Sequence, residues 1–125
     1  MKERYFCSKR MEIAGAHNLN LPYESKCKNL HGHNWIVTVY LTATQLNECG
    51  MIADFAKIKQ AIHGKLDHMY INEILPDINP TAENMSKWVC DEATKLCESD
   101  GMCYRVDIQE SEGNVASFTR SYEDA

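Results

Sequence analysis

The chain has 125 residues and a mass of 14.3 kDa, which suits one domain and is too short for two, so we expect a single domain over residues 1–125. Thirteen Lys and Arg against eighteen Asp and Glu leave a net charge of −5, which argues against nucleic acid as a partner because no overall positive field attracts a phosphate backbone. Hydrophobic residues make up 44% and charged residues 25%, which is typical of a folded globular protein and excludes a disordered chain.

Neither a membrane partner nor an export signal is expected. The longest strongly apolar run, from Trp35 to Leu41, is far shorter than the roughly 20 residues that span a bilayer. The charged start of the chain is not followed by an apolar core, which predicts a cytoplasmic protein. In that compartment the six cysteines are expected to be thiols, and no CxxC pair suggests a zinc ribbon or a thioredoxin-type redox site.

Alternating apolar residues predict two long strands in the first third of the chain. From Tyr5 to His17 the odd positions are mainly apolar and the even positions mainly polar. From His31 to Leu41 the odd positions are histidine, tryptophan, valine and leucine, again with a period of two. We expect these strands to pair through an irregular loop from Asn18 to Leu30.

Two helices are predicted in the middle of the chain. Asp54 can cap a helix that runs to about Leu66, with apolar residues recurring at three- and four-residue spacing. Pro80-Thr81 signals the start of a second helix, whose apolar positions continue to Leu96.

Two further strands are predicted after Asp100-Gly101. Alternate positions place four residues of the first strand on one face: Tyr104, Val106, Ile108 and Glu110. A turn at residues 112–114 leads to the second strand, from Val115 to about Tyr122. The order ββααββ predicts an α+β fold, with a four-stranded antiparallel sheet and both helices on one face.

Three histidines are expected to converge on one metal ion. His31 and His33 lie two apart on a predicted strand, so both imidazoles project from the same face. His17 ends the neighbouring strand in phase with its apolar side. Three neutral imidazoles suit zinc, and a fourth position left to water or substrate is typical of a catalytic site.

Cys27, four residues before His31, has two interpretations. As a fourth ligand it would close the zinc shell and make the site structural, which the spacing favours. As a free thiol beside a metal and a histidine it could act as a base or nucleophile. The residues alone leave both interpretations open.

Asp67-His68 and Glu110 are further candidates. Asp67 can orient the His68 imidazole for proton transfer, although a solvated helix end would also favour a cationic histidine there. Glu110 continues an apolar strand face, and a buried carboxylate needs a partner. A ligand rich in N–H donors would supply that partner, and so would an internal Arg or Lys.

Six motifs follow one another between about His17 and Glu110, over nearly the whole chain. They are Ala16-His17, residues 27–34 (CKNLHGHN), residues 50–55 (GMIADF), Leu66-Asp67-His68, residues 80–84 (PTAEN) and Glu110. In this combination and order they resemble the 6-pyruvoyl-tetrahydropterin synthase superfamily. The three residues between Cys27 and His31 are similar to its bacterial 6-carboxytetrahydropterin synthase branch, which serves queuosine biosynthesis, whereas pyruvoyl-forming relatives usually have a longer insertion there.

The resemblance implies a tunnelling fold, in which subunits close their sheets into a barrel, trimers pair as hexamers and active sites lie between subunits. It also implies a role for each candidate: zinc ligands His17, His31 and His33, catalytic thiol Cys27, proton-relay partners Asp67 and His68, and pterin anchor Glu110. Three positions depart mildly from the family pattern, namely Gly15, Ile71 and Ser111, where Ala, Leu and Thr are usual. None of these departures removes a role.

The implied activity is zinc-dependent conversion of 7,8-dihydroneopterin triphosphate to 6-carboxy-5,6,7,8-tetrahydropterin, with release of acetaldehyde and triphosphate. An alternative is the pyruvoyl-forming synthase, which eliminates triphosphate without losing acetaldehyde. An alternative of another class is a non-catalytic module with a structural zinc held by Cys27 and the three histidines. Asp67-His68 and Glu110 argue against that module, because a structural zinc needs neither.

Overall fold

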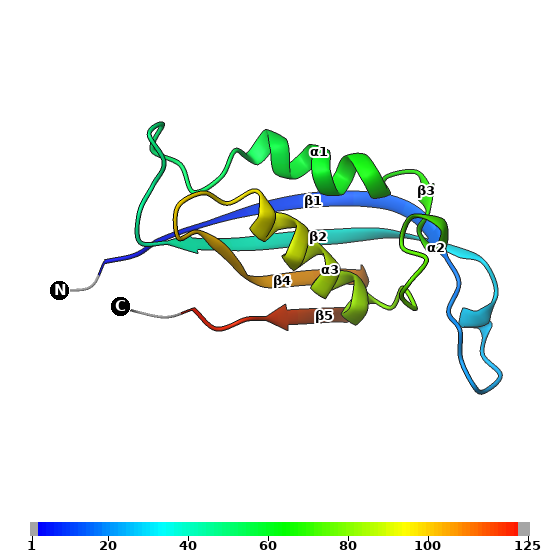
Figure 1. Ribbon diagram of the computed structural model, residues 1–125. Helices are drawn as coiled ribbons and strands as arrows, with labels where there is room; N and C mark the ends of the chain where they lie inside the picture. The colour runs from blue at the N-terminus through cyan, green and yellow to red at the C-terminus, as the bar shows by residue number, and fades with distance from the viewer. Residues whose placement is uncertain (1–2, 123–125) are drawn as a thin grey trace.

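A five-stranded sheet and the helices on one of its faces make up the computed structural model, which describes residues 3–122 (Figure 1). In chain order the elements are β1 (Tyr5–His17), η1 (Lys26–Lys28), β2 (His31–Ala43), α1 (Phe55–Leu66), β3 (Met69–Tyr70), α2 (Ile71–Ile74), α3 (Ala82–Lys95), β4 (Met102–Ser111) and β5 (Asn114–Thr119).

The strands lie in the order β3-β1-β2-β4-β5. β1 and β2 pair antiparallel over their whole predicted length, from Tyr5 opposite Ala43 to His17 opposite His31. β4 pairs antiparallel with both β2 and β5, whereas β3 runs parallel to the end of β1. The α+β class is confirmed, but the prediction of four antiparallel strands is wrong, because the sheet has five strands and is mixed.

Two short elements that were not predicted, β3 and α2, follow α1, and β3 is the strand that makes the sheet mixed. They are two and four residues long, too short for an apolar period to be recognised. His68 leads into β3 with a positive φ of 61°, and its N–H donates to Ala14 O at 2.6 Å. This turn places β3 alongside Gly15 and Ala16, immediately before His17.

α1 and α3 lie against the same face of the sheet, and the core lies between them and the strands (Figure 1). Asp54 caps α1 as predicted, since its side chain accepts from Ala56 N at 2.8 Å. Thr81 caps α3 by accepting from Asn84 N at 3.1 Å. The two predicted helices are therefore present, with α2 as a third. No helix among residues 3–122 is both long and apolar enough to span a membrane.

A β-bulge in β4 changes the predicted face of that strand. Tyr104 is the extra residue in the register with β2, so Cys103 takes the buried position instead. The Tyr104 ring lies on the other face, with its centroid 5.7 Å from that of Phe6. The prediction that Tyr104 shares a face with Val106 and Ile108 is therefore wrong, because a bulge inserts one residue and reverses the alternation.

Candidate functional site

Three histidines and a glutamate meet at the end of the sheet where β1 stops and β2 starts. Their potential metal-ligand atoms all lie within 4.8 Å of one another, in His17, His31, His33 and Glu110. The antiparallel register sets His17 opposite His31, and His33 projects from the same face of β2. The centroids of the three imidazole rings are 4.6 to 5.2 Å apart. Strand pairing alone thus brings the three rings together. We call these four residues the His/Glu cluster.

Backbone carbonyls determine which ring nitrogen carries the proton in two of the histidines. His17 Nδ1 lies 2.8 Å from Pro80 O, and His31 Nδ1 lies 2.7 Å from Asn29 O. A carbonyl oxygen only accepts, so each Nδ1 must be the donor, and the Nε2 of a neutral ring keeps its lone pair. Histidines that bind metal ions are typically oriented by this kind of second contact.

Burial favours the neutral form of two of these rings. Desolvation lowers the pKa of His17 below its ordinary value, although the hydrogen bond to Pro80 acts to raise it. Desolvation also lowers the pKa of His33, against the opposing charge of Glu110. Neutral imidazole is the form that binds a metal ion.

Among residues 3–122, the ion pairs of Glu110 are with imidazoles and not with an Arg or Lys. Its Oε1 lies 3.0 Å from His33 Nε2 and 3.3 Å from His17 Nε2, within ion-pair distance. Neither contact has hydrogen-bond geometry, and both Nε2 atoms are buried without a hydrogen-bond partner. Buried polar atoms in this condition are costly, and a divalent cation would satisfy both at once. The His/Glu cluster therefore fits a metal ion.

Cys27 lies in the same pocket as part of the His/Glu cluster. The pocket has a volume of about 310 Å³ and is lined by Lys26, Cys27, His31, His33, Glu110, Ser111 and Asn114. Cys27 belongs to η1, where its N–H donates to Ser25 Oγ at 3.1 Å. Among the described residues, the group of converging ligand atoms includes Glu110 and not Cys27. This geometry leaves the thiol beside the cluster, as a free side chain.

Asp67 and His68 lie elsewhere, on the outer edge of β1. Asp67 Oδ1 accepts from Ala14 N at 2.9 Å, and its Oδ2 lies 3.5 Å from His68 Nε2 and 3.4 Å from His63 Nε2. The His68 side chain is 83% exposed and borders a separate hollow along β1 and β3. The carboxylate and imidazole are adjacent, but the pocket that contains Cys27 includes neither of them.

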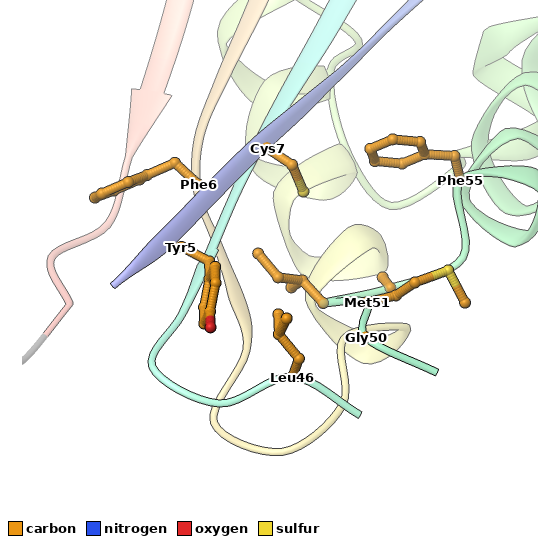
Figure 2. Close-up of a pocket in the computed structure, with 9 residues that line it drawn as sticks. Tyr5, Phe6, Cys7, Leu46, Gly50, Met51 and Phe55 are labelled. Atoms are coloured by element: carbon orange, nitrogen blue, oxygen red, sulfur yellow. The ribbon is translucent and has the colours of Figure 1, made fainter. Parts of the chain in front are cut away.

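The chain also has an apolar pocket of about 270 Å³ at the opposite end of β1. Tyr5 and Cys7 line it from the strand, Met51 lines it from the segment before α1, and Phe55 lines it from the start of α1 (Figure 2). The Cys7 thiol borders this pocket, and burial raises its pKa above the ordinary value. The residues of β1 that line this pocket lie ten to twelve positions before His17, so the pocket is separate from the His/Glu cluster.

Two asparagines near the site carried no signal in the sequence. Asn72 and Asn79 form paired hydrogen bonds with the backbone of Asn18 and Asn20, in the loop that carries Cys27. Isolated asparagines are common in turns, and these partners lie more than 50 residues away in the chain. The folded chain was needed to bring them together.

Comparison with known proteins gives a consistent result. A family model described as 6-pyruvoyl tetrahydropterin synthase matches residues 6–121. A 6-carboxy-5,6,7,8-tetrahydropterin synthase from Synechocystis sp. is 34% identical over 89 residues, covering 65% of this chain and 68% of that protein. A putative 6-carboxy-5,6,7,8-tetrahydropterin synthase from Archaeoglobus fulgidus is 30% identical over 123 residues, covering 96% of this chain and all (100%) of that protein. In fold, the chain resembles the structure of Caenorhabditis elegans 6-pyruvoyl tetrahydropterin synthase, with a TM-score of 0.74, 22% identity, and coverage of 96% of this chain and 98% of that one.

Proposed function

The chain belongs to the 6-pyruvoyl tetrahydropterin synthase family, and from this premise we propose that it is a single-domain, zinc-dependent lyase acting on 7,8-dihydroneopterin triphosphate. The proposed products are 6-carboxy-5,6,7,8-tetrahydropterin, acetaldehyde and triphosphate. The observation that carries the proposal is the convergence of three imidazoles, two of which line one pocket together with a free thiol. Relatives named 6-carboxytetrahydropterin synthase, one of them aligned over almost the whole chain, support this product over the pyruvoyl one.

We assign His17, His31 and His33 as the zinc ligands. The carbonyls of Pro80 and Asn29 hold two of the rings with Nε2 free, which is the atom each would offer to the ion. When bound, zinc would supply Lewis-acid polarisation of the oxygens on the substrate side chain. That polarisation would acidify the adjacent C–H bond.

We assign Cys27 to proton transfer at that C–H bond. The thiol is exposed in the pocket and lies outside the group of converging ligand atoms, which suits a group that must move a proton. Asp67 and His68 are assigned as its relay partners. Because both lie on the outer edge of β1, a second copy of the chain would have to bring them to the pocket.

This requirement supports a homo-oligomer, for which we propose a dimer of trimers. β5 and most of β1 lie at the two edges of the sheet, where backbone groups are available to another chain. Light scattering on the eluted protein should then give a mass near six times the 14.3 kDa of one chain. A monomeric mass would exclude a site shared between subunits.

We assign Glu110 as the pterin anchor. Its carboxylate lines the Cys27 pocket and also the adjoining hollow beside Glu83 and Asn114. Two N–H groups of a pterin ring match the two oxygens of a carboxylate, and such charge-assisted pairs are both strong and directional.

Product analysis tests the proposal. Zinc-loaded protein is incubated with 7,8-dihydroneopterin triphosphate, and the mixture is analysed by mass spectrometry for the carboxy product and acetaldehyde. A 6-pyruvoyl product without acetaldehyde would instead establish the alternative synthase. No turnover by protein that still binds zinc would favour the structural module.

A matched pair of cysteine variants separates the thiol's two roles. Cys27→Ala should keep its zinc and its assembly while turnover collapses, because the histidines remain in place. Cys49→Ala, which removes another exposed thiol from a different loop, should keep both zinc and turnover. Loss of zinc in Cys27→Ala would mean that Cys27 is a structural ligand.

A further inference from the structure

A backbone hydrogen bond links the start of the loop that carries Cys27 to Cys27 itself. Residues 18–30 connect β1 to β2 and contain the turn η1. Within this loop Leu19 N–H donates to Cys27 O at 2.7 Å. The hydrogen bond links the part of the loop that leaves β1 to the residue that bears the thiol. The placement of Cys27 therefore depends on the placement of Leu19.

Two side-chain amides bind the residues on either side of Leu19. Asn72 Oδ1 accepts from Asn18 N at 3.1 Å, and its Nδ2 donates to Asn18 O at 2.9 Å. Asn79 forms the same pair with Asn20, at 2.9 and 3.0 Å. Each amide satisfies both backbone groups of one loop residue, as a neighbouring strand would. Residues 18–20 are thus held at three consecutive positions.

The segment that supplies these amides also contacts the His/Glu cluster. Asn79 precedes Pro80, whose carbonyl oxygen accepts from His17 Nδ1 at 2.8 Å. The carbonyl oxygen of Asn79 in turn accepts from Asn84 Nδ2 of α3, at 2.9 Å. Asn72 lies in α2, and Asn79 lies in the connection between α2 and α3. One segment thereby positions a ring of the cluster and the loop that bears the thiol.

We infer that Asn72 and Asn79 are positioning residues, which set the place of Cys27 relative to the His/Glu cluster through residues 18–20. The inference rests on the proposed function, since it concerns the thiol that we assign to proton transfer. Removing the two amides leaves every histidine and the thiol in the chain and loosens the loop between them, which keeps the hydrogen bond from Tyr70 OH to Asn18 Oδ1. Turnover would fall while zinc binding persists, because a reacting group displaced by about 1 Å can lose two orders of magnitude in rate.

Hydrogen exchange of the zinc-loaded full chain tests the coupling without reference to activity. In Asn72→Ala/Asn79→Ala we expect exchange of the Asn18 and Asn20 amides to rise at least roughly tenfold, because their acceptors are lost. Exchange should also rise at residues 27–29, which neither asparagine touches. The matched control is Asn47→Ala, because Asn47 Oδ1 accepts from Cys49 N and Met51 N in a different loop. That variant should leave residues 27–29 as in the wild type.

Steady-state kinetics with 7,8-dihydroneopterin triphosphate supply the second readout. We expect kcat of the double variant to fall at least roughly tenfold with KM within about threefold of wild type, since the pterin anchor is on β4. Zinc content should be unchanged, and Asn47→Ala should keep the wild-type kcat. Asn72→Asp and Asn79→Asp retain the accepting oxygen and lose the donor, so their kcat values should lie between those of the wild type and the double alanine variant. They replace the alanine variant in the test if that variant does not fold.

Two results would overturn the inference: protection at residues 18–20 as in the wild type, or release of those residues with unchanged exchange at 27–29. A wild-type kcat in a variant whose loop is released would also overturn it. Should the wild-type protein form no pterin product at all, the proposed function fails, and exchange at residues 27–29 still decides whether the asparagines position Cys27.

Discussion

At the scale of single residues, the candidate site depends on where protons are placed. His17 and His31 each donate from Nδ1 to a carbonyl oxygen, which places the proton of a neutral ring on that nitrogen. Burial favours the neutral ring of His17 by lowering its pKa, and it outweighs the opposing effect of the hydrogen bond to Pro80. The Nε2 atoms therefore keep lone pairs that converge on the position next to Glu110.

Removing one imidazole should remove the metal. We expect His31→Ala to lose most of its zinc and its activity, because only two of the three assigned imidazole ligands remain. Metal analysis of the gel-filtered protein measures this. His68→Ala is the matched control, since that ring lies outside the cluster and is 83% exposed, and it should keep its zinc. Full zinc occupancy in His31→Ala would exclude the three-histidine site.

Glu110→Gln should weaken pterin binding by at least roughly tenfold, which corresponds to about 1.4 kcal/mol. The variant sets a donor against a donor where the carboxylate would accept from the ring. Calorimetric titration with the pterin measures the affinity, and we expect unchanged zinc content in the same samples. Wild-type affinity would refute the anchor. Loss of zinc would show that the contact of Oε1 with the imidazoles, at 3.0 and 3.3 Å, reflects metal ligation.

At the scale of elements, the register of β1 against β2 brings the histidines together, and β3 pairs with the end of β1 next to them. Gly15 lies opposite His33 in that register and alongside Met69 of β3. A Cβ at Gly15 would lie 3.0 Å from Met69 O and 3.1 Å from Trp35 Cζ3. Trp35 is fully buried and Met69 O is backbone, so neither atom yields easily. The parallel pairing of β3 with β1 thus uses the space that a side chain at Gly15 would need.

Gly15→Ala should therefore destabilise the protein, by about 1–3 kcal/mol, as overpacking in a dense region typically does. Urea unfolding at fixed protein concentration measures the free energy. Gly64→Ala is the matched control, because its Cβ would meet nothing closer than Lys59 O at 3.9 Å inside α1. That variant should gain up to about 1 kcal/mol from helix propensity. Equal stability of Gly15→Ala and wild type would contradict the packing described at β3.

At the scale of the whole molecule, the two faces of the sheet differ in chemistry. One face packs against α1 and α3, and the other carries a polar network centred on Asp107. Its carboxylate accepts from Tyr40 OH at 3.1 Å, from Arg105 Nε at 2.8 Å and from Ser117 Oγ at 2.6 Å. This network joins β2, β4 and β5 across the face opposite α1 and α3, so it contributes to the stability of this part of the sheet.

The pH dependence of stability follows from this carboxylate. Burial acts to raise the pKa of Asp107, but hydrogen bonds from Ser117, Arg105 and Tyr40 outweigh it and hold the pKa below its ordinary value. A depressed pKa in the folded state adds stability above the unfolded value of about 3.9, and that stability is lost as the pH falls through the folded pKa. The free energy of unfolding of the wild type should therefore exceed that of Asp107→Asn by about 1–2 kcal/mol at neutral pH.

Urea unfolding of both proteins at neutral pH and at a series of decreasing acidic pH values measures this difference. The two stabilities should approach each other as the pH falls through the depressed pKa of the wild-type carboxyl. A difference of the same size at both pH values would mean that charge plays no part in the network. Protein concentration is kept constant, because the stability of an oligomer depends on it.

The residue patterns within single strands and helices were sufficient to predict β1, α1 and the shared face of the histidines. Thirteen residues of alternation were enough to predict β1, and the same period placed His31 and His33 on one face opposite His17. Asp54 and the three- and four-residue spacing after it predicted α1 to its last residue. These features could be predicted because each depends on neighbours along the chain, whose geometry the backbone itself dictates.

Contacts between distant segments were decided by the tertiary structure alone. The bulge at Tyr104, the position of Asp67 on the outer edge of β1 and the imidazole partners of Glu110 leave no periodic trace in the chain. The same holds for Asn72 and Asn79, which bind a loop more than 50 residues away. Such contacts depend on how helices and strands pack after they form, because packing brings side chains together by shape and volume and not by sequence spacing.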